Sequence, residues 1–76
     1  MTTGTFDEVL GARVRALRKA KKIGPDAMAN RIRRSVAQLS RYESGETSID
    51  TETLVIIAFV LGCKVDELLE GIEAQK

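Results

Sequence analysis

The chain has 76 residues, a formal net charge of +1, 43% hydrophobic residues and 4% aromatic residues. This length allows one domain with a modest core and leaves no room for a separate ligand-sensing domain, and the hydrophobic content excludes wholesale disorder. Histidine is absent and Cys63 is the single cysteine, which excludes zinc sites made from His or paired Cys, His-based catalytic triads and intrachain disulfides.

Nothing in the sequence points to a membrane, a cofactor or catalysis. The longest apolar run, 54–61, is far short of the roughly 20 residues that span a bilayer, and no signal-peptide pattern opens the chain. No nucleophile–base or carboxylate pair suggests an enzyme. We therefore expect a cytoplasmic protein of a bacterium or phage, with no cofactor, metal ion, membrane partner or small-molecule ligand.

The first predicted helix follows a polar tail, 1–4, and runs to about Lys21. Thr5 and Glu8 have the spacing of a capping box, in which each side chain bonds the other residue's backbone N–H. The apolar residues that follow recur at helical spacing and form one face: Phe6, Leu10, Val14 and Leu17.

Two short helices are predicted next, joined by three to four residues. Pro25 is well tolerated at the first position of a helix, and this one continues for about two turns to Ile32. Ser35 is a good N-cap for the following helix, 36 to about 42, which Gly45 closes. Small Ala29 on the first of the pair allows the two helices to cross closely at a sharp angle.

The last two predicted helices are more apolar. Asp50 can cap a helix over 51–61 that ends at Gly62 and turns four residues to the core: Leu54, Ile57, Ala58 and Leu61. A fifth helix has Val65, Leu68, Leu69 and Ile72 on its inner face, and 73–76 form a second tail. No strand pattern competes, so we predict an all-α, compact five-helix domain over 5–72.

Charge divides the chain into two halves. Residues 1–42 contain ten Lys and Arg against three Asp and Glu, a balance of +7, and residues 43–76 contain two against eight, a balance of −6. One basic half in so small a domain is typical of a surface that faces a polyanion.

The helix pair over about 25–44 is the candidate functional element. A short helix of this kind fits the major groove of DNA, where Gln and Arg side chains read purine edges and small apolar side chains meet thymine methyl groups. Its outward side chains are predicted to read bases: Val36, Ala37, Gln38 and Arg41.

Several blocks of the sequence resemble the phage Cro and repressor family of helix-turn-helix proteins, also called the xenobiotic-response-element type. The blocks are Leu10-Gly11-x-Arg13-Val14-Arg15-x-Leu17-Arg18, Ala29, Ser35-x-x-x-Leu39-Ser40-Arg41-Tyr42-Glu43-x-Gly45, Glu52-Thr53-Leu54 and Leu61-Gly62-x-x-x-Asp66-Glu67-Leu68-Leu69. The resemblance implies a lambda-repressor-like fold that binds double-stranded DNA, usually as a two-fold dimer on a palindromic site. It also implies that Arg18 and Glu43 pair and orient the recognition helix.

Three residues depart from the family pattern. Pro25 stands where the family usually has Gln, so a side-chain amide contact to the DNA backbone is lost. Arg33 stands where it usually has Gly, and a left-handed backbone there would cost roughly 1 kcal/mol. Arg34 replaces a commonly apolar residue. We expect five side chains to contact phosphates, which would offset the lost Gln: Arg33, Arg34, Ser35, Ser40 and Ser44.

The fourth helix has a second apolar stripe outside its core face, at Ile56, Phe59 and Cys63. A helix that is apolar on nearly all sides must bury its second face as well. We therefore predict a homodimer interface on this stripe, with Leu69 and Ile72 nearby, and a regulator that acts as a repressor. The alternative is an antitoxin-type or other protein-interaction module, in which the same stripe binds a partner protein.

Overall fold

The computed structural model describes residues 5–72, and five helices joined by turns lie within this range. The predicted tails, 1–4 and 73–76, lie outside the described residues. The helices are α1 (Phe6–Ala20), α2 (Pro25–Ile32), α3 (Val36–Ser44), α4 (Thr51–Leu61) and α5 (Val65–Leu69). No strand is present within the described range, so the predicted all-α class is confirmed. None of these helices has the length and apolar content needed to cross a membrane.

The predicted N-caps of three helices are confirmed. The Thr5 hydroxyl accepts from the Glu8 N–H at 3.2 Å while the Glu8 carboxylate accepts from the Thr5 N–H at 2.9 Å, which completes the capping box of α1. The Ser35 hydroxyl accepts from the Gln38 N–H at 3.0 Å, and the Asp50 carboxylate accepts from the Thr53 N–H at 3.1 Å. Each cap satisfies a backbone donor that the first turn of a helix leaves free.

Left-handed residues end three of the helices. Gly45 (φ 82°) closes α3 and Gly62 (φ 71°) closes α4, whereas Arg33 (φ 60°, ψ 45°) closes α2. The left-handed conformation predicted for Arg33 is therefore confirmed, and it stores strain in the turn between the two helices. The helix predicted from residue 36 to about 42 continues to Ser44, because the glycine that stops it comes only at position 45.

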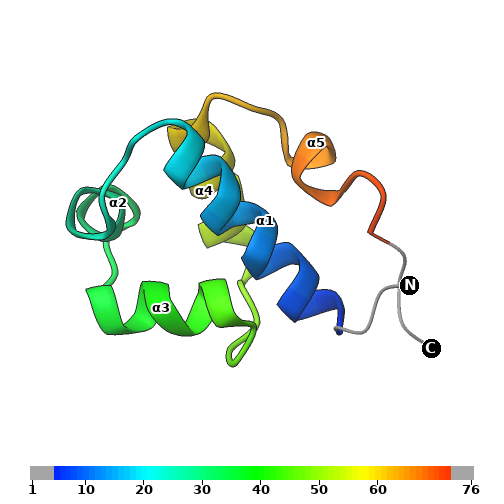
Figure 1. Ribbon diagram of the computed structural model, residues 1–76, viewed down its shortest axis with the longest axis horizontal. Coiled ribbons are helices and arrows are strands. Elements are labelled where there is room, and N and C mark those ends of the chain that lie inside the picture. The colour runs from blue at the N-terminus through cyan, green and yellow to red at the C-terminus, as the bar shows by residue number, and fades with distance from the viewer. Residues whose placement is uncertain (1–4, 73–76) are drawn as a thin grey trace.

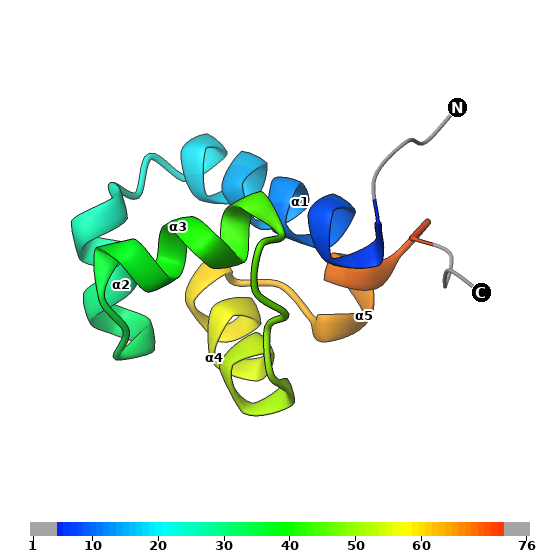
Figure 2. The ribbon, with the colours of Figure 1, turned by 90° about the horizontal axis from the view of Figure 1, so that it is seen from below.

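A buried apolar core joins all five helices: Leu10, Val14, Met28, Ala29, Ile32, Leu39, Tyr42, Ile57, Ala58, Leu61 and Leu68. In Figure 1, α1 crosses the front of the molecule, with α2 to its left, α3 below it, α4 behind it and α5 to its right. Seen from below in Figure 2, α3 lies across the nearest side of the bundle. The third helix is thus both anchored in the core and open to the outside.

Two core assignments in α4 and α5 differ from prediction. Leu54, expected in the core, is only half-buried, and its neighbour Thr53 is buried instead because its hydroxyl donates to Asp50 at 2.7 Å. The fifth helix ends at Leu69, so Ile72 lies beyond it, and Leu68 is its one buried residue.

A side chain from α1 explains why α5 stops where it does. Glu70 adopts an extended conformation (φ −60°, ψ 129°), which breaks the helix. The Arg13 guanidinium donates to the carbonyl groups of Leu68 and Glu70. These carbonyls would otherwise lack partners at the helix end, so Arg13 caps α5 from the opposite helix.

Helix α1 approaches α3 closely at Gly11. A Cβ atom at this position would lie 2.6 Å from the carbonyl oxygen of Glu43 and would also overlap the carbonyl of Tyr42. Both obstacles are backbone atoms of α3, which cannot rotate away. Glycine is therefore the residue that lets α1 touch the last turn of α3.

We expect Gly11→Ala to destabilise the fold by about 1–3 kcal/mol, because α1 and α3 must separate to admit the methyl group. Denaturant unfolding measures this difference. Gly24→Ala is the matched control, since nothing lies within 4 Å of a Cβ atom there. Equal stability of the Gly11→Ala and Gly24→Ala variants would contradict the packing described here.

Candidate nucleic-acid interface

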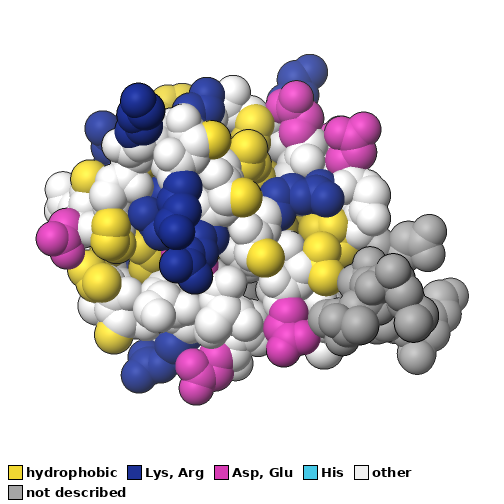
Figure 3. Space-filling view, in the orientation of Figure 1, with side chains coloured by type: hydrophobic (Ala, Val, Ile, Leu, Met, Phe, Trp, Pro, Cys, Tyr) yellow, Lys and Arg dark blue, Asp and Glu magenta, His cyan; other side chains and the backbone are white. Residues whose placement is uncertain are grey.

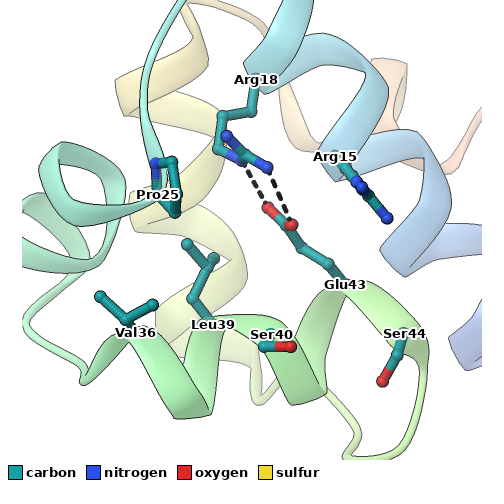
Figure 4. Close-up of a pocket in the computed structure, with 8 residues that line it drawn as sticks. All are labelled: Arg15, Arg18, Pro25, Val36, Leu39, Ser40, Glu43 and Ser44. Atoms are coloured by element: carbon teal, nitrogen blue, oxygen red, sulfur yellow. Dashed lines mark hydrogen bonds and ion pairs between the residues drawn. The ribbon is translucent and has the colours of Figure 1, made fainter.

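An ion pair between Arg18 of α1 and Glu43 of α3 joins the two helices that approach at Gly11. The Arg18 Nε atom lies 2.7 Å from Glu43 Oε2, and Nη2 lies 3.2 Å from Oε1, so the contact is bidentate (Figure 4). Nη1 donates to the Ile23 carbonyl at 2.9 Å. The side chains are 8% and 9% exposed. Every nitrogen of the guanidinium is thus committed within the chain, which fixes α3 against α1.

The side of α3 that faces away from the core carries the residues predicted to read bases. Leu39 and Tyr42 are buried, whereas Val36, Ala37 and Arg41 are exposed and Gln38 is half-buried. Arg41 Nη1 donates to Gln38 Oε1 at 3.4 Å. One turn of helix separates these two residues, so the amide of Gln38 supports the guanidinium of Arg41 at the surface.

All five predicted phosphate-contacting residues are exposed along the turn and α3: Arg33, Arg34, Ser35, Ser40 and Ser44. Ser35 and Ser44 also have structural bonds, the first as the N-cap of α3 and the second through a hydroxyl that donates to the Arg41 carbonyl at 3.2 Å. Ser40 has no hydrogen-bond partner within residues 5–72, so its hydroxyl is available to a ligand.

Arg34, although exposed, is turned toward the start of α4. Its Nη2 donates to the Thr53 hydroxyl at 3.0 Å and its Nε to the Tyr42 hydroxyl at 3.4 Å, and Tyr42 donates in turn to Asp50 at 3.3 Å. The hydrogen bond with Tyr42 raises the pKa of Arg34, and the bonds from Thr53 lower the pKa of Asp50. This polar network ties the turn between α2 and α3 to the cap of α4.

A hollow of about 330 Å³ opens between α1, the start of α2 and α3. Its eight lining residues are Arg15, Arg18, Pro25, Val36, Leu39, Ser40, Glu43 and Ser44, and Figure 4 shows Arg15 reaching from α1 and Ser44 near the end of α3. The Arg18–Glu43 pair forms the inner wall. Sequence reasoning did not single out Arg15; the available signal was its position three residues before Arg18, on the neighbouring face of α1.

The Lys and Arg side chains of the basic half gather in several groups on one view of the molecule. Figure 3 shows such groups at the upper left and at the centre, over α1, while acidic side chains lie mostly toward the edges, at the upper right, the far left and the bottom. Two of the ten basic residues of 1–42 are not exposed: Arg13 is half-buried and Arg18 is buried. The charge that faces outward is therefore smaller than the +7 of the sequence.

The predicted interface stripe on α4 is less uniform than expected. Phe59 is 84% exposed, whereas Ile56 and Cys63 are half-buried and pack against the core. Ile56, predicted to lie outside the core face of the helix, thus packs partly against the core. Leu69 and Ile72 also pack against the core as half-buried residues. Phe59 and the unpredicted Val55, 52% exposed, are the large apolar side chains that α4 leaves open.

Phe59 also lines an open hollow of about 430 Å³ between α2 and α4, together with Arg31, Ile56 and Val60. Burial raises the pKa of the Cys63 thiol, and the nearby Glu67 carboxylate adds to the effect. The thiol therefore stays protonated at neutral pH and is a poor nucleophile.

The comparisons with known proteins agree with this geometry. The family described as "Helix-turn-helix domain" matches residues 9–70, which is most of the chain. The chain belongs to the helix-turn-helix domain family. Residues 25–44 form its two defining helices, α2 and α3, and the lambda-repressor-like fold expected from the sequence is confirmed by the solved structures that it resembles.

Two relatives, one of them also compared as a solved structure, are similar to most of this chain. Repressor protein C2 of Salmonella phage P22 is 34% identical over 64 residues, which are 84% of this chain and 30% of that protein, so the chain spans under a third of its length. The P22 c2 repressor solved with a synthetic operator has a TM-score of 0.75 and 33% identity, covering 91% of this chain and 98% of the other. The clp gene regulator ClgR of Corynebacterium glutamicum has a TM-score of 0.85 and 29% identity, covering 90% and 72%.

We expect Arg18→Ala to lower the free energy of unfolding by about 3 kcal/mol, because Glu43 would remain buried without its partner. Denaturant unfolding measures the loss. Arg15→Ala, on an exposed face of the same helix, is the control and should change stability by no more than about 0.5 kcal/mol. Unchanged stability of Arg18→Ala would mean that the pair contributes nothing to the fold.

Proposed function

We propose that this helix-turn-helix protein is a sequence-specific transcriptional regulator, a repressor, that binds a palindromic operator as a homodimer. One observation carries the proposal: α3 presents its polar outer face while the buried Arg18–Glu43 pair holds it rigidly against α1. A rigid helix loses little conformational entropy on entering the major groove, so little of the free energy of its contacts with DNA is offset by ordering. The similarity to a repressor solved with a synthetic operator supports the same reading.

Base reading falls to Arg41 with Gln38, Val36 and Ala37. An arginine reads guanine through two parallel hydrogen bonds to O6 and N7, which requires a guanidinium held in one orientation. The bond from Arg41 to Gln38 provides that support. Val36 and Ala37 expose short apolar side chains that suit thymine methyl groups.

Backbone contacts are assigned to four exposed residues around α3, namely Arg33, Ser35, Ser40 and Ser44, while Arg34 acts by positioning. The network from Arg34 through Tyr42 and Thr53 to Asp50 holds the turn against α4. A phosphate contact for Arg34, which the sequence suggested, would have to compete with these bonds. We therefore place the uniform, sequence-independent part of the affinity on the other four residues.

Dimerisation is assigned to the face of α4 around Phe59, with Ile56 and Cys63 beside it and Leu69 and Ile72 at its edge. Phe59 is 84% exposed and lines an open hollow. Association with a second copy would remove this apolar surface from water. A single recognition helix reads only a few base pairs, and a second copy placed about 34 Å away along the DNA roughly doubles the contacts.

The same exposed Phe59 favours a second candidate function, an antitoxin-type module whose α4 face binds a different protein. The two candidates differ in their state in solution. A chain that forms a stable dimer alone fits the regulator, and a chain that stays monomeric until a partner protein is added fits the alternative. Sedimentation of the isolated protein separates them.

The proposal predicts that binding to duplex DNA weakens steeply with salt and that Arg41→Ala relaxes base preference at one position. The variant should lose about 1–3 kcal/mol on the preferred sequence and little on random duplex, because the bidentate contact reads one base pair. Fluorescence anisotropy with both duplexes, at several salt concentrations, measures this. Equal losses on both duplexes would remove Arg41 from the base-reading set, and binding that ignores salt would contradict a phosphate-facing surface.

We expect Phe59→Lys to give a folded monomer that has lost operator binding, because a buried lysine in the interface costs several kcal/mol. Phe59→Leu keeps an apolar side chain and should remain dimeric, so it serves as the control. Circular dichroism reports the fold and sedimentation the mass. A helical Phe59→Lys variant that still sediments as a dimer would move the interface elsewhere on the molecule.

A further inference from the structure

We propose that the hollow between α1 and α3 seats one backbone phosphate of the bound DNA, with Arg15 as its cation and Ser40 as its neutral donor. This inference rests on the proposed function and deepens it by naming a phosphate seat and a residue, Arg15, that the sequence did not single out. Its ligand is a phosphodiester that flanks the base pairs read by α3.

The charge balance of the hollow favours an anion. Its acidic wall residue, Glu43, is neutralised by the bidentate contact with Arg18, whose remaining nitrogen donates to the Ile23 carbonyl. The second guanidinium that lines the hollow belongs to Arg15, which is exposed and engaged by no hydrogen bond or ion pair within residues 5–72. One positive charge is thus left over at the opening.

The other lining residues differ in whether they can donate a hydrogen bond to an oxygen atom of the phosphate. Pro25 has no backbone N–H and Leu39 is apolar, so neither can donate. The Ser44 hydroxyl already donates to the Arg41 carbonyl. The Ser40 hydroxyl is exposed and has no partner in the described part of the chain. Arg15 and Ser40 are therefore the two lining side chains whose donors have no partner within residues 5–72, and they line the same hollow from opposite helices (Figure 4).

Helix geometry places this seat beside the base-reading residues. Val36, Ser40 and Ser44 are four residues apart and share one edge of α3, and all three line the hollow. Ala37 and Arg41 follow them by one position and share the adjacent, outward edge. When that outward edge enters the major groove, the DNA strand that borders the groove passes over the hollow. This seat would supply a contact to the DNA backbone in place of the one lost at Pro25. It would also replace a contact from Arg34, whose guanidinium bonds toward α4.

A double-mutant cycle tests the seat. Arg15→Gln, Ser40→Ala and the double variant are titrated by fluorescence anisotropy with the preferred duplex and with a scrambled duplex, at several salt concentrations. Arg15→Gln should weaken both duplexes by about the same factor, roughly tenfold. It should also reduce the slope of log affinity against log salt by about one. Because both residues hold one phosphate, the double variant should lose less than the product of the two single losses.

Lys64→Gln is the control, since it removes the same charge at the start of α5, in the acidic half of the chain. It should change affinity by less than about twofold. Wild-type affinity and salt slope in Arg15→Gln would overturn the seat while leaving the proposed function standing. Fully independent losses in the cycle would overturn the shared phosphate. If the unmodified protein bound neither duplex, the proposed function itself would fail.

Discussion

The contact between Arg18 and Glu43 is the interaction on which the rest of this structure depends. It lies where Gly11 lets α1 touch the last turn of α3, and its two hydrogen bonds determine how α3 is oriented relative to the bundle. Two charges at 8% and 9% exposure are stable only as a pair with satisfied hydrogen bonds, so the contact is intolerant of other geometries. The outward face of α3, the hollow beside it and the turn before it all take their positions from this pair.

The arginines of this chain divide into structural and outward-facing groups, and the sum of charges does not distinguish them. Arg13 caps α5, Arg18 holds α3, and Arg34 links the turn to α4. Each does so because its guanidinium meets carbonyls, hydroxyls or carboxylates that the fold brings within reach. Arg15 has no such partner within residues 5–72, and a cation left free there at the edge of a recognition helix is suited to phosphate.

Local patterns were enough to predict most of the fold, because capping, helix-stop and periodicity signals act within a few residues. The caps at Thr5, Ser35 and Asp50 are such cases, whereas the left-handed Arg33 was expected only from the resemblance to the family. The errors lie where distant segments decide. Thr53 is buried because of a network that includes Arg34, α5 stops where Arg13 reaches its carbonyls, and Ile56 leans into a core that the stripe on its own helix did not reveal. The base-reading and phosphate-contacting residues remain predictions, since sequence and geometry place them on a surface without its ligand.

The central claim is that the outward edge of α3 reads base pairs. Selection of bound sites from a pool of random DNA duplexes tests it most directly, using the unmodified protein and a variant with Ala37 changed to Gln. The account predicts that the unmodified protein enriches a motif made of two symmetric half-sites, and that the variant changes the motif at one position in each half-site. A pool that shows no enrichment over its starting composition, or an identical motif for both proteins, would contradict it.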